Sequence, residues 1–439
     1  MFTNIYLDNF LGISAPIELD FISKSRNKEE NTSVVKIEDG IYINKLIGII
    51  GGNASGKTSI LSAITTIGNI LTSPIYQFNV EDKFNDIQKI IDKDPSSENQ
   101  KLMYDFFNDF NSSIDISFQN FRRKKENTIF RIEMYILDDK EETTGYYTYE
   151  LNLDGINKKI SREYLGFRKK YKDKIENIIE INDTKEGQVY YINRYFKNIV
   201  DINNNKDLEK KYKYIKTFVM HYINNSANIS TDSECNYKDL KYIDWYKKSP
   251  ETLRTLARVV DPKIKDIMVD TDNKYEELLF VLKDGSKITR NMLSTGTERF
   301  LNTIRYVNEI IDKNGILIVD EIEQNLHKDL VGLIIRLFGE MSKNNSQIIF
   351  TTLSPEIFDI TNKDNKKIFK QDSIFILNSD YDDIRINKLM ELKIDGERVK
   401  GDASVANLYK NKKISIHPNI EQINIFLKNF NNWLLKTSQ

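Results

Sequence analysis

A glycine-rich stretch near the N-terminus constrains the fold and the ligand of this chain more than any other feature. Residues 51–59 read Gly-Gly-Asn-Ala-Ser-Gly-Lys-Thr-Ser and match the pattern G-x-x-x-x-G-K-[ST] at every fixed position. Glycines let consecutive backbone N–H groups turn around a phosphate, and the helix that follows presents its positive N-terminal end to the same anion. An apolar run at 46–50 predicts a buried strand before this P-loop, and apolar residues at helical spacing follow it. The order strand, loop and helix predicts a nucleoside-triphosphate site.

The pattern also assigns a role to each residue of the loop. Lys57 is expected to reach the β- and γ-phosphates, and the Thr58 hydroxyl is expected to ligate Mg²⁺. ATP and Mg²⁺ are therefore the expected ligands. The predicted nucleotide-binding residues are Gly51, Asn53, Ala54, Ser55, Gly56, Lys57, Thr58 and Ser59.

Two further segments between residues 293 and 321 indicate what kind of P-loop protein this is. Leu293-Ser-Thr-Gly-Thr-Glu-Arg299 precedes an amphipathic segment, and Gly315-Ile-Leu-Ile-Val-Asp-Glu321 is an apolar strand that ends in two carboxylates. Asp320 is placed to hold Mg²⁺, directly or through water, and Glu321 to orient and deprotonate the attacking water. The stretch from Thr295 to Glu298 is also a capping box, which would start a helix without any ligand. The two interpretations are compatible, since a capped helix start is also an anion site.

In this order, the P-loop, the L-S-x-G segment and the Asp-Glu strand resemble the ABC-type heads of SMC-like ATPases. The resemblance implies that Ser294, Gly296 and Thr297 form a signature loop that closes over the γ-phosphate bound by a second copy. ATP would then lie between two heads.

A closer resemblance concerns residues 320–327, Asp-Glu-Ile-Glu-Gln-Asn-Leu-His. They are similar to the D-E-I-E-x-x-L-H pattern of prokaryotic AAA/ABC ATPases related to the OLD (overcoming lysogenization defect) family. This implies that Asn325 and His327 belong to a D-loop that crosses the dimer interface. Residues 1–10, 347–355 and 402–418 resemble further segments of the same proteins, whereas the middle of the chain is largely unmatched.

One position departs from the family pattern. The family's switch histidine is expected where Leu353 stands, and leucine can bond neither the γ-phosphate nor the attacking water. Cohesin- and condensin-type heads resemble this chain in having leucine there, which implies slow turnover. Ser354 has two interpretations, a substitute for the histidine or a plain helix cap. Gln77 and Gln119 are both candidates for the glutamine that joins Mg²⁺ in ABC heads.

The expected fold is α/β: an ABC/SMC-like P-loop ATPase head with an antiparallel β-layer and a mostly helical insertion. Alternating stretches at 114–121, 128–137, 146–153 and 159–167 predict the strands of the β-layer. The chain lacks the sustained heptads of a long coiled-coil arm. The predicted organisation is an ATPase core at 1–75 and 260–395 that includes the β-layer strands from about 114–167, an inserted mainly helical region at 76–113 and 168–259, and a C-terminal tail segment at 396–439.

Composition sets outer limits. The 439 residues include 64 basic and 65 acidic side chains, so net charge gives no argument for nucleic acid. No apolar run approaches a membrane span and the N-terminus has no signal pattern, so a cytoplasmic location without membrane contact is expected. A single cysteine, Cys235, rules out an intrachain disulfide and a Cys-x-x-Cys zinc hook. The three histidines are too widely separated for metal-ligand spacing.

Two weaker sequence patterns suggest a function but also have a purely structural interpretation. Basic and aromatic residues alternate at 121–125, 167–172, 210–214 and 242–248, which fits nucleic acid. A solvated surface is favoured, because acidic residues are interspersed. Asp380-Tyr-Asp-Asp383 is superficially similar to the D-x-D of TOPRIM nucleases, but a surface turn is favoured because too little chain follows.

The OLD-related resemblance implies an ATP-binding, slowly hydrolysing subunit of an antiphage, abortive-infection type of defence system. It would dimerise head to head and control a separate effector protein, a nuclease or toxin, because the chain itself carries no nuclease motif. Two alternatives stay open. One is a DNA-repair or chromosome-maintenance ATPase, which predicts DNA-stimulated turnover. The other is a nucleotide-bound scaffold that does not hydrolyse ATP, which predicts that Glu321→Gln behaves like wild type in cells.

Overall fold

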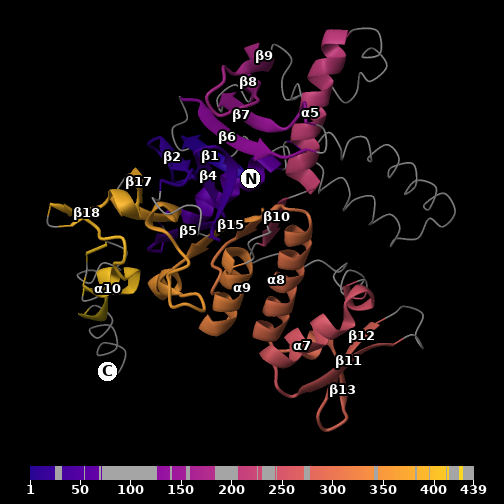
Figure 1. Cartoon of the computed structure of the whole chain (residues 1–439). Coiled ribbons are helices and arrows are strands. Elements are labelled where there is room, and N and C mark those ends of the chain that lie inside the picture. Colours follow the sequence, from indigo (N-terminus) through magenta and orange to yellow (C-terminus); the bar gives the residue numbers. More distant parts are fainter. Residues whose placement is uncertain are drawn as a thin grey trace, which may run out of the picture.

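A computed structural model of the chain gives the structure of most of the predicted elements (Figure 1). Two six-stranded sheets lie one above the other, and a small lobe lies below them. The described residues are 1–24, 32–53, 55–68, 71, 126–138, 141–154, 159–182, 206–224, 226–229, 243, 245–270, 277–340, 345–380, 383–394, 396–411, 413–414 and 425–428.

The central sheet is parallel except at one edge. Its order is β10 (Ser226–Ile229), β14 (Ile316–Val319), β15 (Gln347–Thr352), β5 (Leu46–Gly51), β16 (Ile374–Asp380) and β17 (Asp383–Lys388), with β17 antiparallel to β16. Every residue of β5, β14 and β15 is buried, as expected for strands covered on both faces. The predicted buried strands before the P-loop and before Asp320 are therefore confirmed.

Alternate side chains of this sheet enter two separate cores. Ile47, Ile49 and Ile318 belong to the core that contains the helix after the P-loop (residues 57–68) and α5 (Lys206–Asn224). Ile50 and Leu317 point to the opposite core, which contains α8 (Thr295–Asp312) and α9 (Lys328–Glu340). In Figure 1 these two helices lie side by side below the sheet. The helix after the P-loop and α8 thus cover opposite faces of the central sheet.

The second sheet is an antiparallel β-layer. Its order is β2 (Ile17–Asp20), β1 (Phe2–Asp8), β6 (Thr128–Ile136), β7 (Gly145–Asp154), β8 (Lys159–Arg168) and β9 (Glu176–Asn182). The strands predicted at 128–137, 146–153 and 159–167 are confirmed, and the strand predicted at 114–121 lies outside the described residues. The predicted α/β class with an antiparallel β-layer is likewise confirmed.

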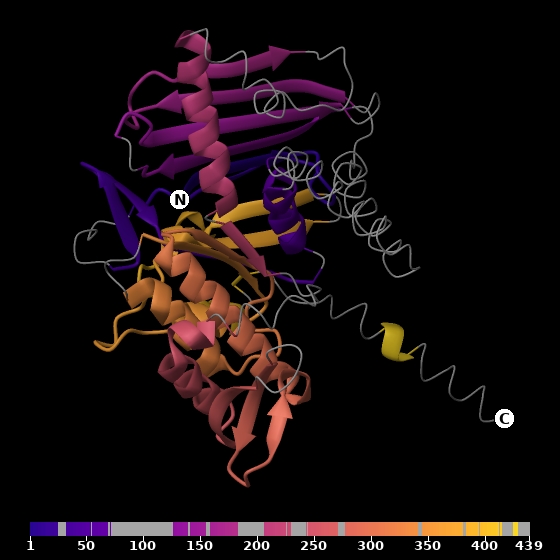
Figure 2. The same cartoon turned by 90° about the vertical axis from the view of Figure 1, so that its right-hand side faces the viewer.

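Helix α5 covers the inner face of the β-layer, and Figure 2 shows it crossing β6 to β9. Ile215, Val219 and Tyr222 are buried on the face of α5 that packs against this core. The Tyr222 hydroxyl donates to the Ile64 carbonyl at 2.8 Å, which joins α5 to the helix after the P-loop. The stretch 168–259, predicted as a mainly helical insertion, contains β9, α5, β10 and α7 (Pro250–Val260) in its described part, and the stretch 76–113 lies outside it.

A small lobe precedes the signature loop and was not predicted. It consists of α7 and a three-stranded antiparallel sheet of β11 (Ile264–Asp270), β12 (Glu277–Leu282) and β13 (Lys287–Thr289).

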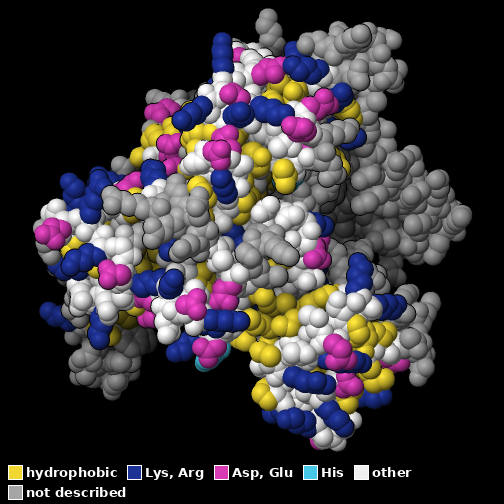
Figure 3. All heavy atoms as spheres, viewed as in Figure 1, with side chains coloured by type: hydrophobic (Ala, Val, Ile, Leu, Met, Phe, Trp, Pro, Cys, Tyr) yellow, Lys and Arg dark blue, Asp and Glu magenta, His cyan; other side chains and the backbone are white. Residues whose placement is uncertain are grey.

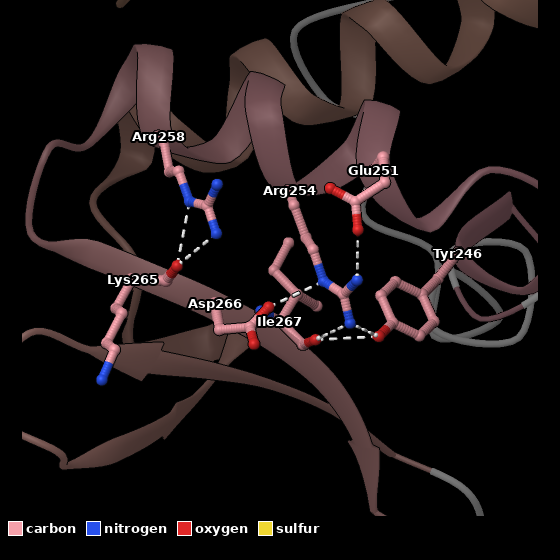
Figure 4. Close-up of polar contacts among 7 residues, drawn as sticks. All are labelled: Tyr246, Glu251, Arg254, Arg258, Lys265, Asp266 and Ile267. Atoms are coloured by element: carbon pink, nitrogen blue, oxygen red, sulfur yellow. Dashed lines mark hydrogen bonds and ion pairs between the residues drawn. The ribbon is translucent and has the colours of Figure 1, made fainter.

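Two arginines of α7 hold this helix against the lobe's sheet (Figure 4). The Arg254 guanidinium binds Glu251 at 2.6 Å, Asp266 at 2.7 Å and the Tyr246 hydroxyl at 2.6 Å. Arg258 donates twice to the Lys265 carbonyl, at 2.9 and 2.6 Å. These bonds hold α7 against β11 in the lobe, which comes directly before the segment that leads into α8.

The remaining described elements are short. Asp359 ends η2 (Pro355–Asp359) and accepts hydrogen bonds from Ser404 Oγ at 2.6 Å and from the Val405 and Ala406 N–H groups at 3.1 and 3.0 Å. It therefore joins η2 to α10 (Val405–Lys410). No helix within the described ranges is long and apolar enough to cross a membrane. The short elements are β3 (Val34–Glu38), β4 (Ile41–Asn44), η1 (Arg290–Met292), η2 (Pro355–Asp359), η3 (Gln371–Ser373), η4 (Leu389–Glu391), β18 (Lys393–Ile394), β19 (Glu397–Arg398) and α10 (Val405–Lys410).

Candidate active site

The P-loop connects the end of β5 to the helix at residues 57–68. Gly56 has a φ of +94°, a conformation that side chains disfavour, and a Cβ there would collide with Ile384 of β17. A Cβ on Gly51 would collide with the buried Ser55 hydroxyl. The positive φ requires glycine at position 56, and at position 51 a Cβ would also lie only 3.1 Å from the Leu377 carbonyl oxygen. Ala54 lies outside the described residues.

Lys57 holds its ammonium at the loop itself. Its Nζ donates to the carbonyls of Gly51 and Gly52, at 2.7 and 2.8 Å. Burial lowers the pKa of Lys57, and the nearby carboxylates of Glu321 and Asp320 oppose this shift. The loop thus keeps a positive charge where the pattern expects the β- and γ-phosphates.

Thr58 and Asp320 meet although 262 residues separate them. The Thr58 hydroxyl donates to Asp320 Oδ2 at 3.0 Å. A hydroxyl and a carboxylate are the donor set with which a protein binds Mg²⁺ together with phosphate oxygens. In the described part of the chain, no cluster of three or more histidine, cysteine, aspartate or glutamate side chains could hold a metal by itself. The residues therefore fit an ion that arrives with the nucleotide.

A threonine that the sequence did not single out organises the two carboxylates. Thr351 Oγ1 donates to Asp320 Oδ1 and accepts the Glu321 N–H at 2.8 Å. Glu321 has a φ of +46°, which is uncommon for a residue with a side chain. The pairing of Val319 with Phe350 brings Thr351 beside Asp320. Thr351 lies in the segment 347–355 that resembles the family, but only this register reveals that its hydroxyl bonds Asp320 and Glu321.

The signature loop caps helix α8. Ser294 Oγ accepts the Thr297 N–H at 3.1 Å and lies 2.8 Å from Thr297 Oγ1. The capping box predicted from Thr295 to Glu298 is therefore wrong by one residue, because Ser294 is the N-cap. Ser294 itself is exposed, so its hydroxyl stands at a helix N-terminus that faces solvent.

The signature loop and the D-loop touch within one chain. A Cβ on Gly296 would lie only 2.8 Å from the Asn325 carbonyl oxygen, so only glycine fits. Asn325 has a φ of +58° and is exposed. His327 is 68% exposed, and its Nδ1 accepts the Asp329 N–H at 3.4 Å at the start of α9.

Arg299 connects the first turn of α8 to the Asp-Glu strand. Its Nη2 donates to the Asp320 carbonyl at 3.4 Å. Burial lowers the pKa of Arg299, while Asp320 and Glu321 raise it. Arg290 of η1 approaches Glu298 at 3.5 Å and joins the lobe to the same helix turn. These contacts link the signature loop to the carboxylates.

Leu353 lies at the end of β15 with its side chain 40% exposed. Its backbone N–H donates to Glu323 Oε1 at 2.6 Å. Ser354 occupies the N-cap position of η2, but its side chain makes no capping bond, so the helix-cap interpretation of this hydroxyl is not supported.

Other sequence candidates lie away from this site or outside the described residues. Gln77, Gln119, His417 and the patch at 121–125 are in the latter group. His221 lies in α5, where burial lowers its pKa to about 3. Asp380 ends β16, Asp383 begins β17, and the two residues pair across the hairpin, in agreement with the predicted turn.

In each of the three patches with described residues, one aromatic ring is buried and the other ring that the structure describes is partly buried. Phe167, Tyr214 and Trp245 are buried, and Lys210 pairs with Glu176 at 2.7 Å. Arg168 pairs with Glu133 at 2.6 Å. Figure 3 shows basic and acidic side chains interspersed over the β-layer. The solvated-surface interpretation is favoured for these patches.

Comparisons with known proteins agree with the P-loop motif. Residues 46–359 match a family model described as "AAA domain, putative AbiEii toxin, Type IV TA system". Among solved structures, the chain is similar to the SMC head domain from Thermotoga maritima, with 12% identity and a TM-score of 0.37 over 88% of this chain and 98% of that chain. It is also similar to an Smc head domain with an extended coiled coil bound to the C-terminal domain of ScpA, derived from Pyrococcus furiosus, with 11% identity and a TM-score of 0.37 over 88% and 95% of the two chains. No curated protein matches.

Proposed function

Because the chain belongs to the family of AAA-domain proteins that its residues 46–359 match, we propose that two copies of this P-loop ATPase close head to head over two Mg-ATP. They hydrolyse the nucleotide slowly and thereby control a separate effector polypeptide in an antiphage defence system. The observation that carries the ATPase part is the meeting of Lys57, Thr58, Asp320 and Glu321 around one loop.

The chemistry follows from the roles of these side chains. Lys57 neutralises phosphate charge, and Thr58 and Asp320 hold the Mg²⁺ that arrives with ATP. Glu321 accepts the proton of the attacking water. The Thr351 hydroxyl donates to the Asp320 carboxylate and accepts the backbone N–H of Glu321, so it fixes Asp320 and the main chain of Glu321 relative to each other.

Pairing of two copies is supported by what the site leaves exposed. Ser294 caps a helix N-terminus that faces solvent. This end of the helix would attract the phosphates of the ATP that a second copy binds. Met292 beside the signature loop is 69% exposed, and Leu353 is 40% exposed. Exposed apolar side chains at the rim of a polar site favour a protein contact.

Control of an effector is supported by the family description, which names a toxin of a toxin–antitoxin system. The same words favour a second candidate, in which this chain is itself the toxic component and its partner neutralises it.

The test is the native mass of the complex purified from its own host with Mg-ATP and the Glu321→Gln substitution, which is expected to retain the bound nucleotide. We expect two copies of the chain with a second polypeptide in fixed ratio. Growth arrest on expressing that polypeptide alone would identify the effector, whereas arrest by this chain alone would favour the toxin candidate. A homodimer that carries only DNA would contradict both and favour the repair ATPase.

A further inference from the structure

Besides the bond from Thr351 Oγ1 to Asp320 Oδ1, three hydrogen bonds join the end of β15 to the turn after β14. Glu321 N–H donates to Thr351 Oγ1 at 2.8 Å, and Ile322 N–H donates to the Thr351 carbonyl at 3.1 Å. In the third bond the direction reverses, because Leu353 N–H donates to Glu323 Oε1 at 2.6 Å. The third bond is the only one of these three in which a side-chain carboxylate accepts a backbone N–H of residues 351–354, called the switch segment below. Its short length fits a charge-assisted bond.

The same carboxylate has an unpaired oxygen. Glu323 Oε2 is buried and has no hydrogen-bond partner within the described ranges. Leaving such an oxygen unpaired destabilises the folded protein. Glu323 also lines a cleft of about 940 Å³ together with Leu326 and Ser354. An apolar residue would avoid this cost, so stability alone does not favour glutamate at this position.

Glu323 lies close enough to the P-loop for its carboxylate to stabilise the positive charge of Lys57. Its carboxylate, with those of Glu321 and Asp320, raises the pKa of Lys57 against the effect of burial. Among the described residues, Glu323 makes no hydrogen bond to the P-loop, so its influence on the phosphates is indirect.

We propose that Glu323 is a positioning residue for ATP hydrolysis. Its Oε1 holds the main chain of Leu353 and so keeps the switch segment in register with Glu321. The side chain of Leu353 cannot bond the reacting groups, and the main-chain bond to Glu323 maintains the geometry of the site in its place. The inference rests on the proposed ATPase function and adds a residue to it.

Two substitutions separate the bond from the charge. Glu323→Gln keeps an oxygen that accepts the Leu353 N–H, whereas Glu323→Ala removes it. We expect the alanine variant to lose about 10- to 100-fold in kcat with little change in KM for ATP, since a displacement of about 1 Å costs up to 100-fold. The glutamine variant should keep kcat within about threefold of wild type, because the acceptor is retained. Glu356→Ala is the matched control, since Glu356 lines the same cleft and its side chain makes no hydrogen bond to the switch segment in the described part of the chain.

Hydrogen exchange of the Leu353 amide gives a readout independent of turnover. Protection should be lost in Glu323→Ala and kept in Glu323→Gln and Glu356→Ala. Wild-type kcat in the alanine variant, unchanged protection there, or equal damage by glutamine and alanine would each overturn the proposal. A wild-type protein without turnover would instead refute the proposed ATPase function, and the exchange measurement would still test the bond.

Discussion

Glu321→Gln is expected to lower the rate of ATP hydrolysis at least about 100-fold, the scale of losing a general base. The glutamine keeps the size of the side chain and the backbone bond from Glu321 N–H to Thr351, so the loop geometry should persist. Affinity for ATP should stay within about threefold, because the lost interaction acts on the transition state. The measurement is steady-state phosphate release together with ATP binding by calorimetry.

Lys57→Ala is the contrasting variant. Its ammonium belongs to the phosphate loop, so its removal should weaken ATP binding at least about tenfold, as expected for losing charge-assisted bonds worth about 1.5–3 kcal/mol. A Glu321→Gln protein that hydrolyses ATP at the wild-type rate would contradict the assignment of the base. If wild-type protein showed no hydrolysis yet required Lys57 in cells, the scaffold alternative would be favoured.

Gln347→Leu is expected to lower the free energy of unfolding by about 3–5 kcal/mol, because it leaves buried backbone groups without partners. Gln347 is fully buried at the start of β15. Its Oε1 accepts the Phe2 N–H at 2.9 Å, and its Nε2 donates to the carbonyls of Phe2 and Asn44 at 3.1 and 3.0 Å. One side chain therefore joins the β-layer, the β3–β4 hairpin and the central sheet.

Urea denaturation of the nucleotide-free protein measures this loss. Gln371→Leu is the control, because the Gln371 side chain bonds the Lys400 carbonyl near the surface. That variant should change stability by less than about 1 kcal/mol. A loss below this value for Gln347→Leu would show that the sheets do not depend on this link.

The central strands and the P-loop could be predicted because their signals are local. Ile-rich runs mark β5, β14 and β15, and the alternation at 128–167 marks β6, β7 and β8. The lobe of α7 and β11 to β13 was missed as a unit, because no motif refers to its strands. The position of the lobe beside α8 depends on contacts between segments that are separate in the sequence, and a local sequence pattern does not show such contacts.

Within the candidate site, the residues to which the sequence assigned no role bond to partners that are far away in the sequence. Thr351 reaches Asp320 and Glu321 only because β14 and β15 pair in one register. Glu323 acts through the backbone of Leu353, and no residue type at that position announces such a bond. The N-cap was misplaced by one residue, because Ser294 and Thr295 are equally good caps by type and only backbone geometry decides between them.

The most direct test of the account is the mass of the Glu321→Gln protein in solution with and without Mg-ATP, measured by analytical ultracentrifugation. Ser294→Asp is the informative partner variant, since aspartate preserves the helix cap and places a negative charge against the second copy's phosphates. Ser294→Asn preserves the cap without the charge. We expect Mg-ATP to double the mass of Glu321→Gln and of its Ser294→Asn derivative, but not that of its Ser294→Asp derivative. A Glu321→Gln protein that binds ATP and stays a single copy would contradict the paired-head mechanism.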